Sequence, residues 1–256
     1  TTLAGSGASG DADGVGDAAQ LANPAGIAIS QDGSALFVAD VMNNKIRRFE
    51  VATGAVTTLA GSGDEGDADG VGDAAQFANP AGIAVSPDGG ALFVADCMNN
   101  KIRRVEVATG EVTTIAGSGE ASDADGVGDA AQFYNPCGIA ISTDGSALFV
   151  ADLDNHKIRR VEVATGAVTT FAGSGAGSAD GVGGAAQFNY PYGVTISPDS
   201  SALFVADCGY KIRRMEVATG AVTTLAGSGV RGSVDGVGGE AQFEHPVALA
   251  ISPDGS

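Results

Sequence analysis

A glycine-rich acidic loop, GDADGVGDAAQF at residues 66–77, holds side chains whose type and spacing could bind a metal ion. Its carboxylates lie at Asp67, Asp69 and Asp73, and calcium prefers oxygen ligands of this kind. Three copies of the loop carry all three carboxylates. The candidate calcium ligands are therefore Asp11, Asp13, Asp17, Asp67, Asp69, Asp73, Asp123, Asp125 and Asp129.

Comparison of the five copies of this loop favours an architectural role over calcium binding. The last two copies keep a single one of these carboxylates, Asp180 or Asp235, whereas Asp-Gly-Val-Gly and Ala-Gln recur in every copy. An EF-hand loop needs oxygen ligands at positions 1, 3 and 5 and a closing Glu at position 12. This loop has glycine at position 4 and no closing Glu. We expect its glycines to form a tight turn and DAAQF to form a short helical turn.

The loop belongs to a unit of about 56 residues that recurs along the chain. AGSG begins at Ala4, Ala60, Ala116, Ala172 and Ala226, and the Asp of VAD recurs in steps of 56, 56 and 55 residues. Self-similarity at such a period indicates a repeat architecture. We interpret residues 1–256 as one domain with repeats near 6–61, 62–117, 118–173 and 174–227 and a partial repeat at 228–256.

Each unit has the pattern of short strands joined by tight turns. In the first unit the predicted strands are GIAIS (26–30), ALFVAD (35–40), KIRRFEV (45–51) and AVTTLAG (55–61). Gly- and Asn-rich turns separate them, and no segment shows helical periodicity. The sequence therefore predicts an all-β fold, a β-propeller of four-stranded antiparallel blades with four complete repeats and a partial fifth.

The segment NPAGIAVSPDGGALFVADCMNNKIRRVEV, from Asn79 to Val107, resembles an NHL repeat through its P-x-G-I-A, D-G, V-A-D and N-x-x-I-R elements. The resemblance recurs in all four complete units and implies a propeller, commonly with six blades. The repeat here is longer, because of the acidic loop, and four units do not close such a ring. A five-bladed ring would need roughly 24 further residues and a six-bladed ring roughly 80. We therefore expect further sequence or neighbouring copies to cover the open strand edges.

Basic residues are concentrated on one predicted strand of each blade. KIRR motifs supply 12 of the 13 Lys and Arg residues. We expect their first arginines to pair with the Asp of VAD, and that Asp to cap the Asn-rich turn that follows it. The predicted ring consists of Asp40, Asp96, Asp152, Asp207, Arg47, Arg103, Arg159 and Arg213. The alternative, nucleic-acid binding, conflicts with a net charge of −18 and the absence of Trp.

The cysteines suggest a link between blades. Cys97 follows VAD in the second unit, and Cys137 precedes the first strand of the third, so both lie on the same face of adjacent blades. We predict a disulfide between them. Cys208 occupies the position of Cys97 in the fourth unit, where the partner position is Val247, so Cys208 is free or bonds outside the chain. The alternative is that all three are isolated small apolar side chains.

Catalytic motifs are not evident. Some propeller enzymes that resemble this family hold a metal with several histidines, but this chain has only His156 and His245, in non-equivalent positions. No Ser/His/Asp set, Cys/His pair or phosphate-binding loop stands out. We therefore expect a protein that is not an enzyme and has no cofactor, with a metal-dependent lyase or hydrolase as an alternative.

Composition points to a binding or structural role. Hydrophobic residues make up 44% of the chain, and its 31 acidic residues favour basic partners. No run of 18 apolar residues predicts a membrane span. We expect a scaffold that binds protein partners or ligands through its acidic loops, or a structural subunit of an extracellular polymer made of copies of itself. The possible disulfide and the acidic surface favour an extracellular or secreted setting.

Overall fold

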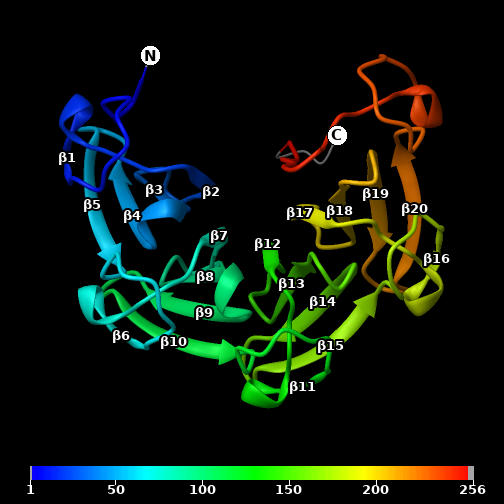
Figure 1. The fold of residues 1–256 in the computed structure, drawn as a ribbon, viewed down its shortest axis with the longest axis horizontal. Coiled ribbons are helices and arrows are strands. Elements are labelled where there is room, and N and C mark those ends of the chain that lie inside the picture. Colours follow the sequence, from blue (N-terminus) through cyan, green and yellow to red (C-terminus); the bar gives the residue numbers. More distant parts are fainter. Residues whose placement is uncertain (1, 253–256) are drawn as a thin grey trace.

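The computed structural model describes residues 2–252, and antiparallel sheets make up most of its regular structure (Figure 1). The first blade comprises β1 (Gly14–Val15), β2 (Pro24–Ile29), β3 (Ala35–Asp40), β4 (Lys45–Glu50) and β5 (Ala55–Ala60). The second comprises β6 (Gly70–Val71), β7 (Pro80–Val85), β8 (Ala91–Asp96), β9 (Lys101–Glu106) and β10 (Glu111–Ala116).

The third and fourth blades repeat this order. The third comprises β11 (Gly126–Val127), β12 (Pro136–Ile141), β13 (Ala147–Asp152), β14 (Lys157–Glu162) and β15 (Ala167–Ala172). The fourth comprises β16 (Gly181–Val182), β17 (Pro191–Ile196), β18 (Ala202–Asp207), β19 (Lys211–Glu216) and β20 (Ala221–Ala226). Single 3-10 turns are the helical elements of the described chain: η1 (Gly16–Ala18), η2 (Val41–Asn43), η3 (Gly72–Ala74), η4 (Cys97–Asn99), η5 (Gly128–Ala130), η6 (Gly183–Ala185) and η7 (Gly238–Glu240). No helix among the described residues is long and apolar enough to cross a membrane.

The predicted propeller blades are confirmed, with one addition. The first sheet has the order β1-β5-β4-β3-β2, and the other three sheets follow the same order. The fifth strand is only two residues long and comes from the acidic loop that precedes the blade, where Gly14 and Val15 pair with Val56 and Ala55. The longer repeat is therefore explained by a loop that runs to the outer edge of its own blade and covers the edge strand.

Neighbouring blades pack through apolar side chains that alternate along their strands. At the first junction, Phe37 and Ile46 of the first blade pack with Leu92 and Val105 of the second. Phe77, at the end of the second acidic loop, is fully buried in the same cluster. Equivalent clusters lie at the next two junctions. The ALFVAD and KIRR segments thus present one apolar face to each neighbouring blade.

Glycine allows the inner strands to approach one another closely. A Cβ atom at Gly26 would lie 2.0 Å from the carbonyl oxygen of Ala81, and one at Gly82 would lie 2.2 Å from that of Cys137. No side chain fits at such distances. The glycine of the P-x-G-I motif is therefore required because the inner strands converge near the propeller axis.

The blades follow one another along an arc that is open between the first blade and the C-terminal segment (Figure 1). The last described segment, residues 228–252, contains η7 but no assigned strand. On the first blade, 61% of Ile27 is exposed, whereas its equivalent in the second blade, Ile83, is 7% exposed. The side of the first blade at the open end of the arc therefore shows part of the apolar surface that the other blades bury.

Candidate functional site

The acidic loop and the KIRR motif meet in a buried charge cluster. In the second blade, Nη1 of Arg103 donates to Asp96 at 2.7 Å and to the carbonyl oxygen of Gln76 at 3.0 Å. Its Nη2 donates to Asp69 at 2.8 Å and to the carbonyl oxygen of Ala68 at 2.9 Å. The side chains of Arg103 and Asp96 are fully buried. One guanidinium therefore joins the second strand of the blade to its acidic loop.

The structure brings the predicted Asp–Arg pairs together in all four blades, and each arginine has a second acidic partner. Arg47 pairs with Asp40 and Asp13, Arg159 with Asp152 and Asp125, and Arg213 with Asp207 and Asp180. The sequence interpretation missed these loop aspartates as arginine partners. Their signal was present, because this aspartate precedes Gly-Val-Gly in every copy of the loop.

An aromatic ring completes the cluster in three blades. The guanidinium of Arg103 lies 5.2 Å from the ring centroid of Phe77, and Arg159 and Arg213 lie similarly over Phe133 and Phe188. This geometry permits a cation–π interaction. Nε of Arg103 is buried without a hydrogen-bond partner among the described residues. The arginine is thus held by its two terminal nitrogens and by the ring.

The Asp of VAD does not have the predicted capping role in the first three blades. No side chain caps the backbone of η4. Asp96 instead accepts hydrogen bonds from the backbone N–H of Ala78 and from the side chain of Asn99, each at 2.8 Å. Only in the fourth blade does the equivalent residue, Asp207, accept the N–H of the turn, from Gly209. Burial raises the pKa of Asp96 to about 6, against the opposing effect of Asn99, Ala78 and Arg103.

The calcium candidates lie in three different environments. Asp11, Asp67 and Asp123 pair with Lys45, Lys101 and Lys157 at 2.6–2.7 Å, and Lys101 lowers the pKa of Asp67. Asp13, Asp69 and Asp125 bind the buried arginines and a threonine of the outer strand. Asp17, Asp73 and Asp129 are exposed in the first turns of η1, η3 and η5. Among residues 2–252, no three His, Cys, Asp or Glu side chains are grouped so that they could hold a metal ion together.

Both histidines take part in contacts between blades. Nδ1 of His156 accepts a hydrogen bond from the backbone N–H of Tyr190 at 3.1 Å, and the two rings lie 4.5 Å apart. The ring of His245 contacts that of Tyr210. Asn100 has the position of His156 in the preceding blade, and its side-chain oxygen accepts the N–H of Asn135 in the same way. Burial lowers the pKa of His156, while the nearby carboxylates of Asp154 and Asp207 raise it.

The predicted partners Cys97 and Cys137 lie side by side at the junction of the second and third blades. Their sulfur atoms are 3.7 Å apart, and both side chains are buried. The structure has them as free thiols, so it shows the adjacency and not the disulfide bond. Cys208 is a partly buried thiol near the carbonyl oxygen of Pro246.

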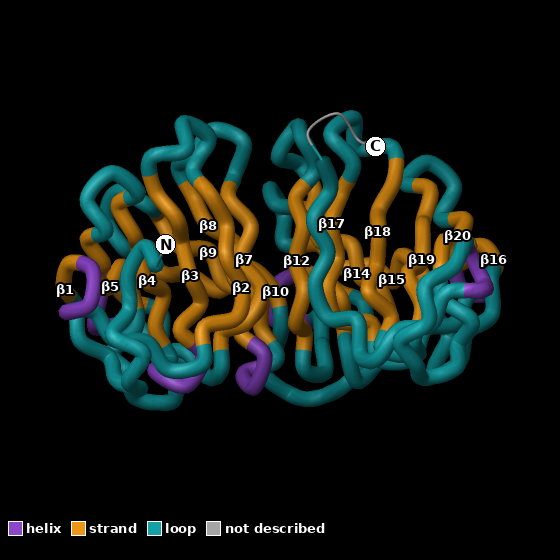
Figure 2. Tube along the Cα trace, turned by 90° about the horizontal axis from the view of Figure 1, so that it is seen from above, coloured by secondary structure: helices purple, strands orange, loops and turns teal. Residues whose placement is uncertain are grey.

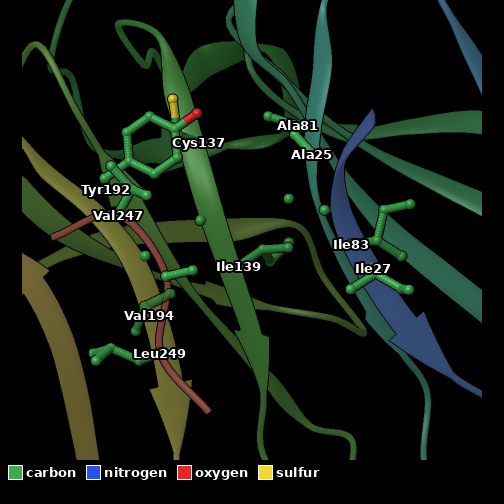
Figure 3. A pocket seen from close by; sticks show the side chains of 15 residues that line it. Ala25, Ile27, Ala81, Ile83, Cys137, Ile139, Tyr192, Val194, Val247 and Leu249 are labelled. Atoms are coloured by element: carbon green, nitrogen blue, oxygen red, sulfur yellow. The ribbon is translucent and has the colours of Figure 1, made fainter. Parts of the chain in front are cut away.

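A central cavity of about 320 Å³ lies between the inner strands (Figure 3). Its walls repeat the same motif positions, with Ile27, Ile83, Ile139, Val194 and Leu249 around it. The side chains that line it are apolar except for Cys137 and Tyr192. Among the described residues that line the cavity there is no carboxylate, histidine or basic side chain.

Exposed apolar and aromatic side chains lie on what we term the loop face, formed by the acidic loops and the turns after β3, β8, β13 and β18. It is the lower side in Figure 2. Met42 and Met98 are 66% and 57% exposed, and Tyr134 and Tyr190 are nearly half exposed. Val71 is also exposed, but it lies on the edge strand β6 at the outer rim of its blade, as do its equivalents in the other blades. Exposed Met and Tyr side chains are typical of surfaces that contact proteins.

Comparison with known proteins places this geometry in a family. No protein-family model matches the chain. It is 36% identical over 163 residues to NHL repeat-containing protein 2 of Bos taurus, which covers 60% of this chain and 22% of that protein. The chain is an NHL-repeat β-propeller. It is also 28% identical over 263 residues to Protein SUPPRESSOR OF QUENCHING 1, chloroplastic, of Arabidopsis thaliana, which covers 98% of this chain and 25% of that protein.

Solved structures agree on the fold of this NHL-repeat chain. A chain from a nidogen/laminin complex superposes with a TM-score of 0.61 and 17% sequence identity, covering 88% of this chain and 67% of the other. At that identity the likeness concerns the fold alone. The chain spans about a quarter of the length of the curated relatives named above.

Proposed function

We propose that this NHL-repeat propeller is a non-enzymatic scaffold that binds a protein segment across its loop face. The observation that carries the proposal is the exposure of Met42, Met98, Tyr134 and Tyr190 on that single face. Tyrosine contributes strongly to protein interfaces, and methionine adapts its shape to a partner. The fold of a chain from a nidogen/laminin complex supports the proposal, since that protein is seen bound to another.

The acidic side chains of the loops define the charge of the partner. Asp73, and its equivalents Asp17 and Asp129, are exposed and form no ion pair within residues 2–252. Acidic side chains also lie on the opposite face, at Asp32 and its equivalents, where hydrogen bonds from Ser30 and Ser34 lower the pKa of Asp32 to about 2. Charge alone therefore does not select the loop face, whereas the exposed Met and Tyr side chains do. The partner is a basic segment with apolar side chains.

Peptide display on the purified chain tests this function. Selected peptides should be net basic and contain aliphatic or aromatic residues. Their binding should fall at least tenfold with the double variant Met98→Ser/Tyr134→Ser, which corresponds to about 1.4 kcal/mol. The control is Asp88→Asn on the opposite face, which should bind like the parent chain. Peptides that lose affinity only with the control, or that carry no basic bias, would contradict the proposal.

A second function, assembly of copies into an extracellular polymer, is favoured by the two open ends of the arc. Each junction within the chain joins a phenylalanine-bearing blade face, such as that of Phe37, to a face such as that of Ile83. At one end of the arc, Phe204 of the fourth blade is less buried than its equivalent Phe37. At the other end, Ile27 of the first blade is exposed. Light scattering tests this function. Concentration-dependent growth that Ile27→Asp abolishes would support it, and a monomer at all concentrations would exclude it.

The extracellular setting is part of the same proposal and is supported by the adjacent thiols Cys97 and Cys137, which an oxidising compartment would join. Its test is the redox state of this pair in protein isolated from its source under acid trapping. A fully reduced pair would contradict an extracellular setting.

A further inference from the structure

Two buried thiols from different blades form a contact that the proposed binding function does not use. Cys97 lies in the turn after the second strand of its blade, and Cys137 lies at the start of the next inner strand. The thiol of Cys97 donates to the sulfur of Cys137 at 3.7 Å, and the thiol of Cys137 donates to the carbonyl oxygen of Asn135 at 3.4 Å. The two groups are thus oriented toward each other across the junction.

The backbone around this pair is fixed by close packing. The carbonyl oxygen of Cys137 lies so close to Gly82 that no Cβ could be placed there, which holds the two inner strands in one register. Ala81, Leu153 and Tyr192 pack around the sulfurs. A disulfide needs its sulfur atoms about 2.05 Å apart. Because the strands themselves are held in place, rotation of the two side chains must bring the sulfur atoms from 3.7 Å to bonding distance.

We propose that Cys97 and Cys137 are a reversible thiol–disulfide pair that locks the second blade to the third beside the central cavity. The oxidant is a small-molecule disulfide such as oxidised glutathione. One cysteine sulfur attacks it and releases one reduced thiol, and the second cysteine sulfur displaces the other. One protein S–S bond forms, two S–H bonds are lost, and the small disulfide is reduced to two thiols.

The surroundings of Cys97 and Cys137 slow thiol–disulfide exchange at this pair and protect the reduced thiols from oxidation. The contact with Cys137 and burial raise the pKa of the Cys97 thiol, so little thiolate is present at neutral pH. Tyr192 lies over the pair from the cavity side, and Figure 3 shows its ring beside the Cys137 sulfur. The rate of exchange is therefore set by movement of the Tyr192 ring away from the sulfurs and rises with pH.

The fourth blade supplies a matched control within the same chain. Cys208 has the position of Cys97, but Val247 stands where Cys137 stands. Cys208 is also more accessible than the pair. It can form a mixed disulfide with glutathione but has no second cysteine sulfur beside it among the described residues. Comparison of Cys208 with the Cys97–Cys137 pair therefore distinguishes formation of an intramolecular disulfide from the reactivity of a single thiol with glutathione.

The experiment incubates the purified full chain with oxidised glutathione, quenches it with acid, alkylates it under denaturing conditions and maps it by mass spectrometry. We expect loss of all three alkylatable thiols: Cys97 and Cys137 in a cross-linked pair of peptides, and Cys208 as the only cysteine that carries glutathione. The oxidised chain should unfold roughly 5–10 °C higher, reversibly with dithiothreitol. Cys97→Ser should remove the shift, while Cys208→Ser should keep it.

Variants at Tyr192 give a second measurement. Tyr192→Ala should form the cross-link severalfold faster than the parent chain, whereas Tyr192→Phe, which keeps the ring, should match the parent. The proposal is overturned if Cys97 and Cys137 stay fully alkylated in samples where Cys208 carries glutathione. It is equally overturned if the two cysteines each carry glutathione without forming a bond. Neither result affects the proposed binding by the loop face, which is assayed with reduced protein.

Discussion

The first and second blades have nearly the same sequence but very different exposure. The inner strand reads PAGIAI in β2 and PAGIAV in β7. Ile83 is buried against the first blade, whereas Ile27 lies at the open end of the arc and is largely exposed. The charge cluster differs less, because Arg47 is as fully buried as Arg103. The apolar environment of a blade is thus set by its neighbours, and its charge environment is set by its own loop.

Removing a buried arginine is expected to have the largest effect. Arg103→Ala leaves Asp96 buried without its cation and should lower the free energy of unfolding by about 3–5 kcal/mol. Arg47→Ala should lower it by about 1 kcal/mol less, since Leu21 stands where Phe77 lies over Arg103. Urea denaturation of both variants measures the difference. Equal losses would show that the ring contributes nothing.

Truncation of the inner-strand isoleucine should show most clearly how the first and second blades differ in stability. Ile83→Ala creates a void in the first junction and should destabilise the chain by about 2–4 kcal/mol. Ile27→Ala removes an exposed side chain, and its effect should stay within about 0.5 kcal/mol. Thermal unfolding of the pair checks this. A large loss from Ile27→Ala in a monomeric sample would mean that another part of the chain covers it.

The junction between the third and fourth blades should contribute a stability that depends on pH, because it contains His156. The junction between the second and third blades has Asn100 at that position and should not. The pKa of His156 is lowered in the folded chain, so the unfolded chain binds the proton first as pH falls. The contribution of His156 to stability is complete above its unfolded pKa of about 6.5 and declines as pH falls from there toward the folded pKa.

His156→Asn copies the Asn100 contact of the second junction and should remove this part of the pH dependence. The difference between parent and variant, measured by urea denaturation from pH 7.5 to pH 5, isolates the histidine from carboxylates such as Asp96, whose pKa is raised. A difference that does not change over this range would contradict the role given to His156.

The smallest effects should come from the exposed side of the acidic loop. Lys101→Met breaks the pair with Asp67, whose side chain is 62% exposed, and should lower stability by about 0.2–1 kcal/mol. Millimolar calcium should leave the melting temperature of the parent chain unchanged, because the loop aspartates are divided among lysine, arginine and solvent. A calcium-dependent rise that Asp73→Asn abolishes would restore the calcium hypothesis.

Periodicity in the sequence was sufficient to predict the fold. Residues that repeat every 56 positions predict blades, the apolar run of ALFVAD predicts a buried strand, and the mixture of charged and apolar residues in KIRRFEV predicts a strand nearer the edge. The pairing of Arg103 with Asp96 also followed from the sequence, because adjacent strands of a hairpin bring these positions close together. These features depend on local pattern, which a single sequence displays directly.

The remaining features of the site depend on how the acidic loop folds back over its blade. Asp69 meets Arg103 across 34 residues, and strand β6 has only two residues, too few to show alternation. The capping prediction for Asp96 was wrong because the loop N–H of Ala78 and the side chain of Asn99 take its carboxylate. Such competition between partners appears only when the chain is assembled in three dimensions.

The four partners that bind each buried arginine all belong to the same repeat. For Arg103 they are Asp96, Asp69, Gln76 and Ala68, which lie within residues 62–117. Gene duplication or deletion of a whole repeat therefore never separates a buried charge from its counter-charge. The new neighbours need only match apolar surfaces that are already alike. A gene of this kind can gain or lose blades by unequal recombination while each product keeps its buried ions neutralised.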